Sequence, residues 1–379
     1  MFWLILFAAC ALAILYVLAG YPLLLALLAR YRARPVQKRL EPKSISIIIA
    51  VHNGEMFLRN KLRSVLGLRY PRELMQILVV SDGSTDATDA IAAEFAGEGV
   101  DLLRVPRAGK PAALNAGIRQ AAGEILVLTD VRQELEPESV ERLVACFADP
   151  AVGVVSGELL IRRGALHEEA NIGLYWRFES WMRKQLSALD SMFGATGPFY
   201  AMRRSLAVTI PEDALLDDVY LPLSAFFRGF RLIVEPQARA IDYPTTLDTE
   251  FRRKVRTLAG NYQIVGYFPA LLGPANRMWL HFVSYKLGRL LLPYALIGLA
   301  VGSFGLRPPW VFLALGAQLA GYGLAALDPW IPAGWLLKRV SSPARTFVVM
   351  MLAATCAVQV FFVPPRKLWK PTTIPSVKG

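Results

Sequence analysis

Two acidic residues at the ends of apolar runs are the first candidates for chemistry in this 379-residue chain. Asp82 follows "MQILVVS", and Asp130 follows "EILVLT". A lone acid in such a position is most often a cap for the next helix, but Ser84 or Thr85 can already cap the helix after Asp82. Two acids that end two strands at the same edge of a sheet therefore favour a ligand-binding edge.

The elements that must position these acids alternate along the chain from Ser44. Strands are predicted at "SISIIIAV", "MQILVVSD", "DLLRVPR" and "EILVLTD", and each is followed by a segment with helical spacing. This alternation predicts an α/β fold, with right-handed crossovers and a mostly parallel sheet covered by helices on both faces. Ligands bind beyond the carboxyl ends of strands in such sheets, which is where both acids lie.

Several enzyme classes are disfavoured by the motifs that the sequence lacks. No G-x-G-x-x-G follows the first strand, and no G-x-x-x-x-G-K-[ST] occurs, which disfavours a dinucleotide fold and a P-loop NTPase. No G-x-S-x-G elbow occurs and the chain has only three histidines, so a hydrolase triad is not expected.

Apolar segments at both ends of the chain predict membrane helices. The apolar fraction is 54%, and uncharged Phe2–Ala29 is long enough to span a bilayer. The basic run "RYRAR" follows it, which indicates a retained helix with its amino terminus outside the cytoplasm. Three further stretches are predicted near the other end, with orientations left open: about 282–304, 310–327 and 347–363. The expected domains are residues 1–30, 42–250, 251–275 (interfacial), 280–365 and 366–379 (a basic tail).

The net charge of +12 is carried by residues that are scattered or flank apolar segments. This pattern favours contact with anionic lipid headgroups and argues against a nucleic-acid partner. The three cysteines have neither the spacing of a zinc site nor a pattern that suggests disulfides.

Seven ordered blocks carry a resemblance to a known family. They are "SIIIAVHNGE", "VVSDGSTDAT", "GKPAALNAG", "LTDVRQ", "FGATGPFYAMRR", "LLDDVYLP" and "FRRKVRTLAGNYQ". Between about Ser44 and Gln263 the chain resembles a family 2 glycosyltransferase, and its layout is similar to membrane synthases of bacterial cell-surface polysaccharides. The resemblance implies a Rossmann-like sheet of the GT-A type and an inverting transfer from a nucleotide sugar.

A donor site is implied by four of these blocks. Ala50 and Val51 match the start of the donor pocket, and Asp82 matches the acid that hydrogen-bonds the nucleobase, usually uracil. Lys110 lies where a basic or polar group faces the donor. Asp130 matches the first acid of the D-x-D motif and would face the ribose or a metal ion.

The catalytic group that the resemblance implies is Asp218, which matches the general base. A sugar hydroxyl is a poor nucleophile until a positioned carboxylate takes its proton. Asp217 is expected to set the local charge or to cap a helix, because neighbours on a strand face opposite ways and only one should face the acceptor. Arg256 matches the arginine that binds the donor diphosphate, although "FRRKVR" could equally be a basic anchor beside an interfacial helix.

The block "FGATGPFYAMRR" matches the loop on the acceptor side. Its glycines would let the backbone approach a sugar closely, and Phe193, Phe199 or Tyr200 could stack on a sugar ring. A plain turn between core strands remains an alternative. The acceptor-binding residues predicted here are Phe193, Gly194, Thr196 and Gly197.

Two departures from the family pattern put details in doubt. Arg132 replaces the second acid of D-x-D, and an arginine cannot ligate a metal ion. Either Mg²⁺ or Mn²⁺ is held by Asp130 and the diphosphate, which we favour, or Arg132 supplies part of the metal's charge. In the processive Q-x-x-R-W motif, Arg253 replaces the glutamine and Thr257 the tryptophan, which favours transfer of one or a few sugars.

The sequence therefore predicts an integral membrane glycosyltransferase, in a bacterial inner membrane, with its catalytic domain in the cytoplasm. It would move a sugar, from a UDP-sugar in the first place, to a lipid-linked or polysaccharide acceptor. A homodimer or a separate flippase could complete the export path. Two rivals stay open: a polyprenyl-phosphate sugar synthase, and an inactive nucleotide-binding scaffold of a secretion complex.

Overall fold

The computed structural model describes residues 1–161, 169–242 and 247–368 of the chain, and the predicted tail from residue 369 onward lies outside them. The chain divides into two compact units. The sheet unit consists of Arg32–Arg163 and Leu186–Pro244. The apolar-helix unit consists of Met1–Tyr31, Gly164–Gln185 and Thr245–Gly379.

One eight-stranded sheet, in the order β3-β2-β1-β4-β7-β6-β8-β5, forms the centre of the sheet unit. Its inner strands are buried almost throughout, as expected for apolar runs covered on both faces. The strands are β1 (Ile45–Val51), β2 (Met75–Asp82), β3 (Val100–Val105), β4 (Ile125–Thr129), β5 (Glu134–Leu135), β6 (Val152–Ile161), β7 (Phe199–Arg203) and β8 (Arg231–Asp242).

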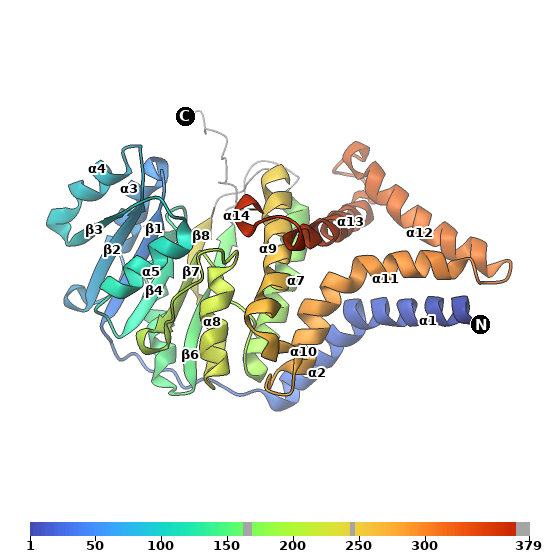
Figure 1. Cartoon of the computed structure of the whole chain (residues 1–379), viewed down its shortest axis with the longest axis horizontal. Coiled ribbons are helices and arrows are strands. Elements are labelled where there is room, and N and C mark those ends of the chain that lie inside the picture. The colour runs from blue at the N-terminus through green and yellow to red at the C-terminus, as the bar shows by residue number, and fades with distance from the viewer. Residues whose placement is uncertain (162–168, 243–246, 369–379) are drawn as a thin grey trace. The chain divides into compact units, whose positions relative to one another are not determined.

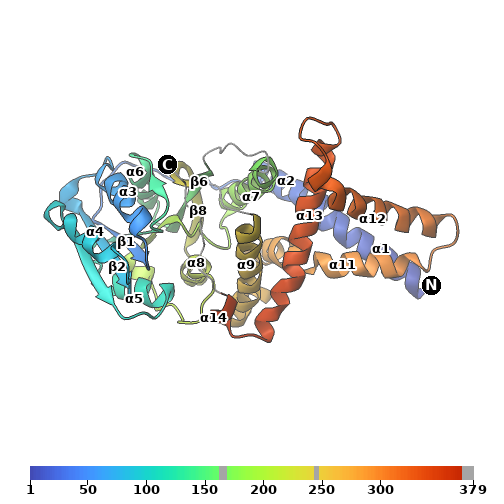
Figure 2. The ribbon, with the colours of Figure 1, turned by 90° about the horizontal axis from the view of Figure 1, so that it is seen from above.

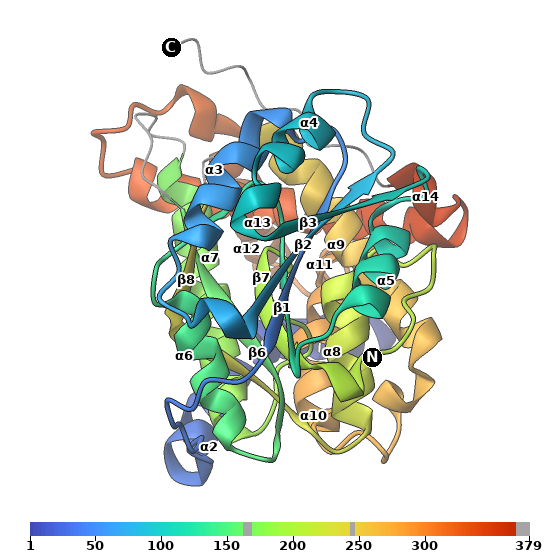
Figure 3. The same ribbon diagram turned by 90° about the vertical axis from the view of Figure 1, so that its left-hand side faces the viewer.

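Helices cover both faces of this sheet, as Figure 3 shows, with α3 and α6 on one side and α5 and α8 on the other. The apolar stripe of α3 illustrates the cause, since Leu58, Leu62 and Val65 recur at helical spacing and are all fully buried. The helices of this unit are α3 (Glu55–Leu66), α4 (Thr88–Glu94), α5 (Lys110–Gln120), α6 (Ser139–Ala145) and α8 (Asp217–Phe227). Helix α7 (Glu169–Leu189) contributes residues to both units, because the division of the chain falls between Gln185 and Leu186.

The α/β class is confirmed, and the sheet is mixed, with four parallel pairs of neighbouring strands and three antiparallel ones. Strands β3, β2, β1 and β4 are parallel neighbours, as predicted from the alternation. Strand β7 then pairs antiparallel with both β4 and β6, and β5 pairs antiparallel with β8. The prediction missed this change because "FYAMR" follows the long helix α7 instead of a short crossover.

Glycines and polar side chains join the helices of the apolar-helix unit (Figures 1 and 2). Helices α1 (Phe2–Leu15) and α11 (Gly288–Ser303) run side by side in both views. A Cβ atom on Gly302 would lie 2.7 Å from the backbone nitrogen of Phe7, so only glycine permits this approach. The hydroxyl groups of Tyr16 and Ser284 hydrogen-bond at 2.7 Å, and each lies in a π-helical turn.

Four helices of the described chain are long and apolar enough to cross a membrane: Phe2–Arg32, Trp279–Ser303, Trp310–Trp330 and Lys338–Phe361. They confirm the predicted apolar helices at both ends of the chain. The last one begins nine residues before the predicted stretch at 347, since its polar first turns belong to the same helix. The remaining helices of the unit are α2 (Tyr21–Arg32), α9 (Leu247–Tyr267), α10 (Trp279–Phe282), α12 (Trp310–Leu327), α13 (Lys338–Ala357) and α14 (Pro365–Leu368).

Candidate active site

A lysine joins two of the predicted acids at the carboxyl edge of the sheet. The Nζ atom of Lys110 lies 2.9 Å from Oδ1 of Asp130 and 3.3 Å from Oδ2 of Asp217. Asp130 directly follows β4, whereas Lys110 and Asp217 are the first residues of α5 and α8. Three segments that are far apart in sequence therefore meet at one point, which is the arrangement expected at the edge of an α/β sheet.

The charges of this group stabilise one another. Burial disfavours a charged lysine, but the carboxylates of Asp130, Asp217 and Asp218 outweigh it and raise the pKa of Lys110 above its usual value. Burial also disfavours a charged Asp130, but Lys110 lowers the pKa of Asp130 below its usual value, with Lys61 and Arg132 assisting. Lys110 and Asp130 are consequently both ionised at neutral pH.

Asp218 lies beside the loop that was predicted to bind the acceptor. A Cβ atom on Gly197 would lie 2.7 Å from Oδ2 of Asp218, so the absence of a side chain there leaves room at the carboxylate. The loop is fixed on either side, because Ala195 N donates to Asp218 O at 2.7 Å and Thr196 N donates to Ser156 Oγ at 2.8 Å. Residues Thr196, Gly197 and Asp218 are thus brought together, as the sequence predicted.

Asp217 and Asp218 begin a helix, and the expectation that neighbouring residues on a strand would separate them is wrong. The two carboxylates instead differ in their contacts. Asp217 is bound to Lys110, and Asp218 is next to Gly197. Asp217 therefore sets the local charge, which is one of the two roles expected of it.

The aromatic residues of the acceptor loop are buried, which does not fit the idea that they stack on a sugar. Phe193 is 2% exposed and packs edge-on against Phe226, with ring centroids 6.4 Å apart. Phe199 and Tyr200 are fully buried. Gly194 has a φ of +149°, and a Cβ atom added at this position would lie 2.7 Å from the Val219 side chain. The loop therefore needs a glycine here.

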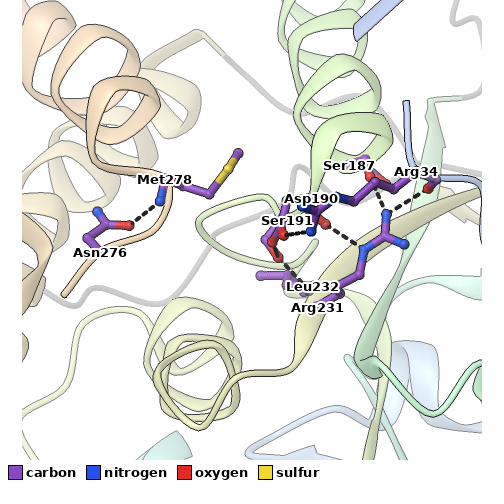
Figure 4. Close-up of polar contacts among 8 residues, drawn as sticks. All are labelled: Arg34, Ser187, Asp190, Ser191, Arg231, Leu232, Asn276 and Met278. Atoms are coloured by element: carbon purple, nitrogen blue, oxygen red, sulfur yellow. Dashed lines mark hydrogen bonds and ion pairs between the residues drawn. The ribbon is translucent and has the colours of Figure 1, made fainter. Parts of the chain in front are cut away.

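A buried arginine anchors the start of this loop (Figure 4). The Nε atom of Arg231 donates to Asp190 O at 3.1 Å, and its Nη2 atom donates to Ser187 O and to Arg34 O. Its guanidinium therefore satisfies carbonyl groups at the last turn of α7 and in the segment after the first apolar helix. The acceptor loop leaves α7 from this fixed point.

Asp82 is bound to the chain segment that precedes Lys110. Its carboxylate is 3% exposed, pairs with Arg107, and accepts hydrogen bonds from Ala108 N at 2.8 Å and Gly109 N at 3.0 Å. Gly109, with a φ of +100°, leads directly into α5. Asp82 thus positions Lys110, while its predicted contact with a nucleobase stays a prediction.

Ala50 and Val51 end β1, as the resemblance required. Ala50 is half-buried and Val51 is 3% exposed, so Val51 could meet a donor only through its backbone. Helix α4 begins at Thr88 after Ala87 as N-cap, and Thr88 N donates to the Asp86 carboxylate at 3.0 Å. The proposed caps Ser84 and Thr85 are wrong, because they lie before the turn and contact Asn53 instead.

Arg132 is paired with an acid that the sequence analysis overlooked. Its Nη2 atom lies 2.5 Å from Oδ2 of Asp242, and the two side chains are 13% and 4% exposed. Asp242 ends β8 and is a third acid at the end of a strand, which is the signal that could have found it. Because Arg132 is neutralised by Asp242, the pair adds little net charge beside Asp130.

Lys61 is the other group that the sequence analysis missed. It is 1% exposed and donates to Thr129 Oγ1 at 2.6 Å and to the Gln133 carbonyl at 2.7 Å. Burial lowers the pKa of Lys61 to about 7. The sequence could have revealed Lys61 by its position between Leu58 and Leu62, on the apolar stripe of α3. Lys61 braces both ends of the segment that carries Asp130 and Arg132.

The described residues hold no group of three or more His, Cys, Asp or Glu side chains that could bind a metal ion. Asp130, with 36% of its side chain exposed, is the one predicted ligand at this edge. Magnesium often takes one or two protein carboxylates and completes its shell with phosphates and water. The residues therefore fit a metal that arrives with a diphosphate. Arg256 lies half-buried on α9, in the apolar-helix unit, and its predicted role stays a prediction.

The sheet and its helices have a fold of the GT-A type, which a solved structure shares. The mannosyltransferase PcManGT from Pyrobaculum calidifontis, solved with GDP-mannose and Mn²⁺, has the same fold, with a TM-score of 0.72 and 23% identity. The superposition covers 93% of this chain and 98% of that one.

Sequence relatives identify the family. Residues 46–210 match the family model described as "Glycosyl transferase family 2". A β-monoglucosyldiacylglycerol synthase from Synechocystis sp. is 25% identical over 86% of this chain and 74% of its own. A poly-β-1,6-N-acetyl-D-glucosamine synthase from Staphylococcus epidermidis is 25% identical over 59% of this chain and 56% of its own. Residues 46–210 thus form a family 2 glycosyltransferase domain, and the chain spans between 56% and 74% of these relatives' length.

Proposed function

We propose that this enzyme transfers a sugar, with inversion, from a nucleotide sugar to a lipid-linked or glycan acceptor at the membrane. The observation that carries the proposal is the meeting of Asp130, Lys110 and Asp218 at one edge of the sheet. Asp130 and Lys110 offer a charged pair to a diphosphate, and Asp218 offers a carboxylate beside the open backbone at Gly197.

The reaction uses these groups in sequence. Asp218 accepts the proton of the acceptor hydroxyl, whose oxygen attacks the anomeric carbon. The bond between that carbon and the diphosphate oxygen breaks, and the nucleoside diphosphate leaves with the electron pair. Lys110 faces the negative charge that develops there, and Arg256 is our candidate for a second cation. A bound Mg²⁺ or Mn²⁺ would neutralise part of the diphosphate charge; PcManGT was solved with Mn²⁺.

A membrane acceptor is supported by the four apolar helices and by the relatives. The relative with the broader coverage is named for a glycolipid product, and the other for a polysaccharide. Thr257, in place of the tryptophan of processive enzymes, favours the addition of one or a few sugars. A ladder of long chains from the purified enzyme would contradict this part. The proposal also includes a bacterial inner membrane as the location, a catalytic domain that faces the cytoplasm, and a dimer or flippase partner.

The test is nucleotide release by the detergent-purified protein from a panel of UDP- and GDP-sugars, with Mn²⁺, Mg²⁺ or a chelator. Each is run with a lipid extract as the acceptor source. We expect release from one donor that is lost with chelator, since Arg132 is already paired with Asp242 and cannot replace the metal's charge. Release that survives chelation would overturn the metal part of the proposal. Donor binding without release under every condition would favour the scaffold alternative.

A further inference from the structure

Tyr200 presents a hydroxyl group that has no hydrogen-bond partner within the described residues. The side chain is 0% exposed and lies on β7, beside Leu128 of β4 and Ser156 of β6. Paired residues point to the same face of a sheet. Ser156 binds Thr196 of the acceptor loop, so this is the face on which that loop lies.

The charges of the active-site acids act on the Tyr200 hydroxyl. Burial raises the pKa of Tyr200 well above its usual value, and the negative charges of Asp217, Asp218 and Asp130 raise it further. The hydroxyl therefore stays protonated and acts as a donor. The strand that carries Tyr200 is also joined to both parts of the site, because Asp130 N donates to Pro198 O at 3.2 Å and Ser156, opposite Tyr200, holds Thr196 of the acceptor loop.

An unpaired buried hydroxyl lowers the stability of a fold, because the group loses its hydrogen bonds to water and gains none. Phenylalanine would fill the same space without this loss. The buried polar groups that a native protein leaves unpaired often have a role in binding or catalysis. The Tyr200 hydroxyl is thus open to a partner that comes with the ligand.

From these observations we infer that the Tyr200 hydroxyl donates a hydrogen bond to an oxygen atom of the sugar bound between Asp130 and Asp218. The inference rests on the proposed function. Tyr200 gives up no proton in the reaction; it orients the sugar against the carboxylate that does the chemistry. The sugar is either the transferred residue of the donor or the acceptor, and the two sources predict different kinetics.

The test compares Tyr200→Phe with the wild type in the full-length, detergent-purified enzyme, using the donor that the wild type turns over. Two reactions are followed: slow hydrolysis of the donor without acceptor, and transfer in the presence of the lipid extract. A hydrogen bond to the donor sugar predicts that both rates fall, by roughly tenfold. A bond to the acceptor predicts that transfer alone falls, with a raised KM for the extract.

The thermal midpoint separates this role from a structural one. Tyr200→Phe should melt at the wild-type temperature or above it, because no bond within the protein is lost. Tyr70→Phe is the matched control: its hydroxyl accepts from Lys43 N at 2.9 Å and donates to Lys43 O at 2.6 Å, away from the acids. That variant should melt lower and keep its activity.

Three results would overturn the inference. If Tyr200→Phe hydrolyses and transfers within twofold of the wild type, the hydroxyl does not touch the sugar, while the proposed function stands. If the wild type itself is inactive in both reactions, the proposed function fails and the inference fails with it. A variant that melts below the wild type and loses activity would assign Tyr200 a structural role instead.

Discussion

Two clusters of charged side chains, one in each unit, differ in how their charges are paired. In the apolar-helix unit, Asp328 has 1% of its side chain exposed and accepts from Ser341 at 2.6 Å and Ser342 at 3.0 Å. Lys338 and Arg345 pair with the same carboxylate. All four donors come from the first eight residues of α13, so the cluster closes the connection between α12 and α13.

The cluster around Asp130 has the opposite properties. Its members come from β4, α5 and α8, which are distant in sequence, and they share a single lysine. A hydroxyl nearby, that of Tyr200, has no partner within the part of the chain that the structure describes. The Asp328 cluster takes all its donors from one helix and stabilises the fold, whereas the unpaired Tyr200 hydroxyl beside the distributed cluster indicates a site for a ligand.

The largest effect that would test this contrast is expected from Asp218→Asn. The amide cannot take the acceptor's proton, so transfer should fall by roughly 10²–10⁴-fold. The thermal midpoint should change little, because Lys110 keeps its ion pairs with Asp130 and Asp217. Rates of product formation and melting curves of the purified protein check both parts. Asp101→Asn, at an exposed position on β3, is the control and should change neither.

Retention of transfer in Asp218→Asn would end its assignment as the base and would favour an acceptor that needs none, such as a lipid phosphate. A large loss of stability would instead show that this cluster serves the fold, as Asp328 does.

The sequence predicted those parts of the fold that depend on local patterns. The first four strands of the chain and their parallel order follow from apolar runs that alternate with helical spacing, as in "SISIIIAV" before α3. The antiparallel insertion of β7 was missed, because strand direction depends on the path of the chain through α7 and not on the composition of "FYAMR". The four apolar helices were evident from length and hydropathy alone.

The site was predictable as a set of residue types, but its pairings were not. Asp130, Lys110 and Asp218 could be named from their blocks, while the contact of Lys110 with two acids depends on how α5 and α8 meet the sheet. The partner of Arg132, Asp242, lies 110 residues further along the chain. A sequence pattern shows which positions are polar, and it takes the packing to show which of them lack a partner.

The second prediction concerns Asp328 in the apolar-helix unit, where a substitution should lower the stability and leave transfer intact. Asp328→Ala removes the acceptor of two serines and the partner of Lys338, leaving buried donors without a bond. Loss of one partner from a buried ionic network costs on the order of 3 kcal/mol, so the thermal midpoint should fall by several degrees. Transfer per folded molecule should remain. A variant that stays as stable as the wild type but loses transfer would contradict the structural role given to this cluster.

The smallest effect is expected at Lys61, a group of the sheet unit that costs stability in a pH-dependent way. Its pKa of about 7 in the folded protein is below the usual value near 10.5 that it has when unfolded. Below pH 7 both states bind the proton, and the folded state bears the full cost of a buried charge. Between pH 7 and 10.5 only the unfolded state keeps the proton, so stability must rise with pH.

Lys61→Met should remove this rise. We expect the melting temperature of Lys61→Met, measured relative to the wild type, to be highest near pH 6.5. It should then decline steadily toward pH 10, by an amount equivalent to on the order of 1–3 kcal/mol. The lost hydrogen bonds to Thr129 and the Gln133 carbonyl add a constant offset, and only the slope is diagnostic. Lys61→Arg stays charged over this pH range, so its stability should not rise with pH as that of the wild type does. A flat difference between Lys61→Met and the wild type would mean that Lys61 keeps its charge with a normal affinity for the proton, and that the segment carrying Asp130 is braced by an ordinary ammonium group.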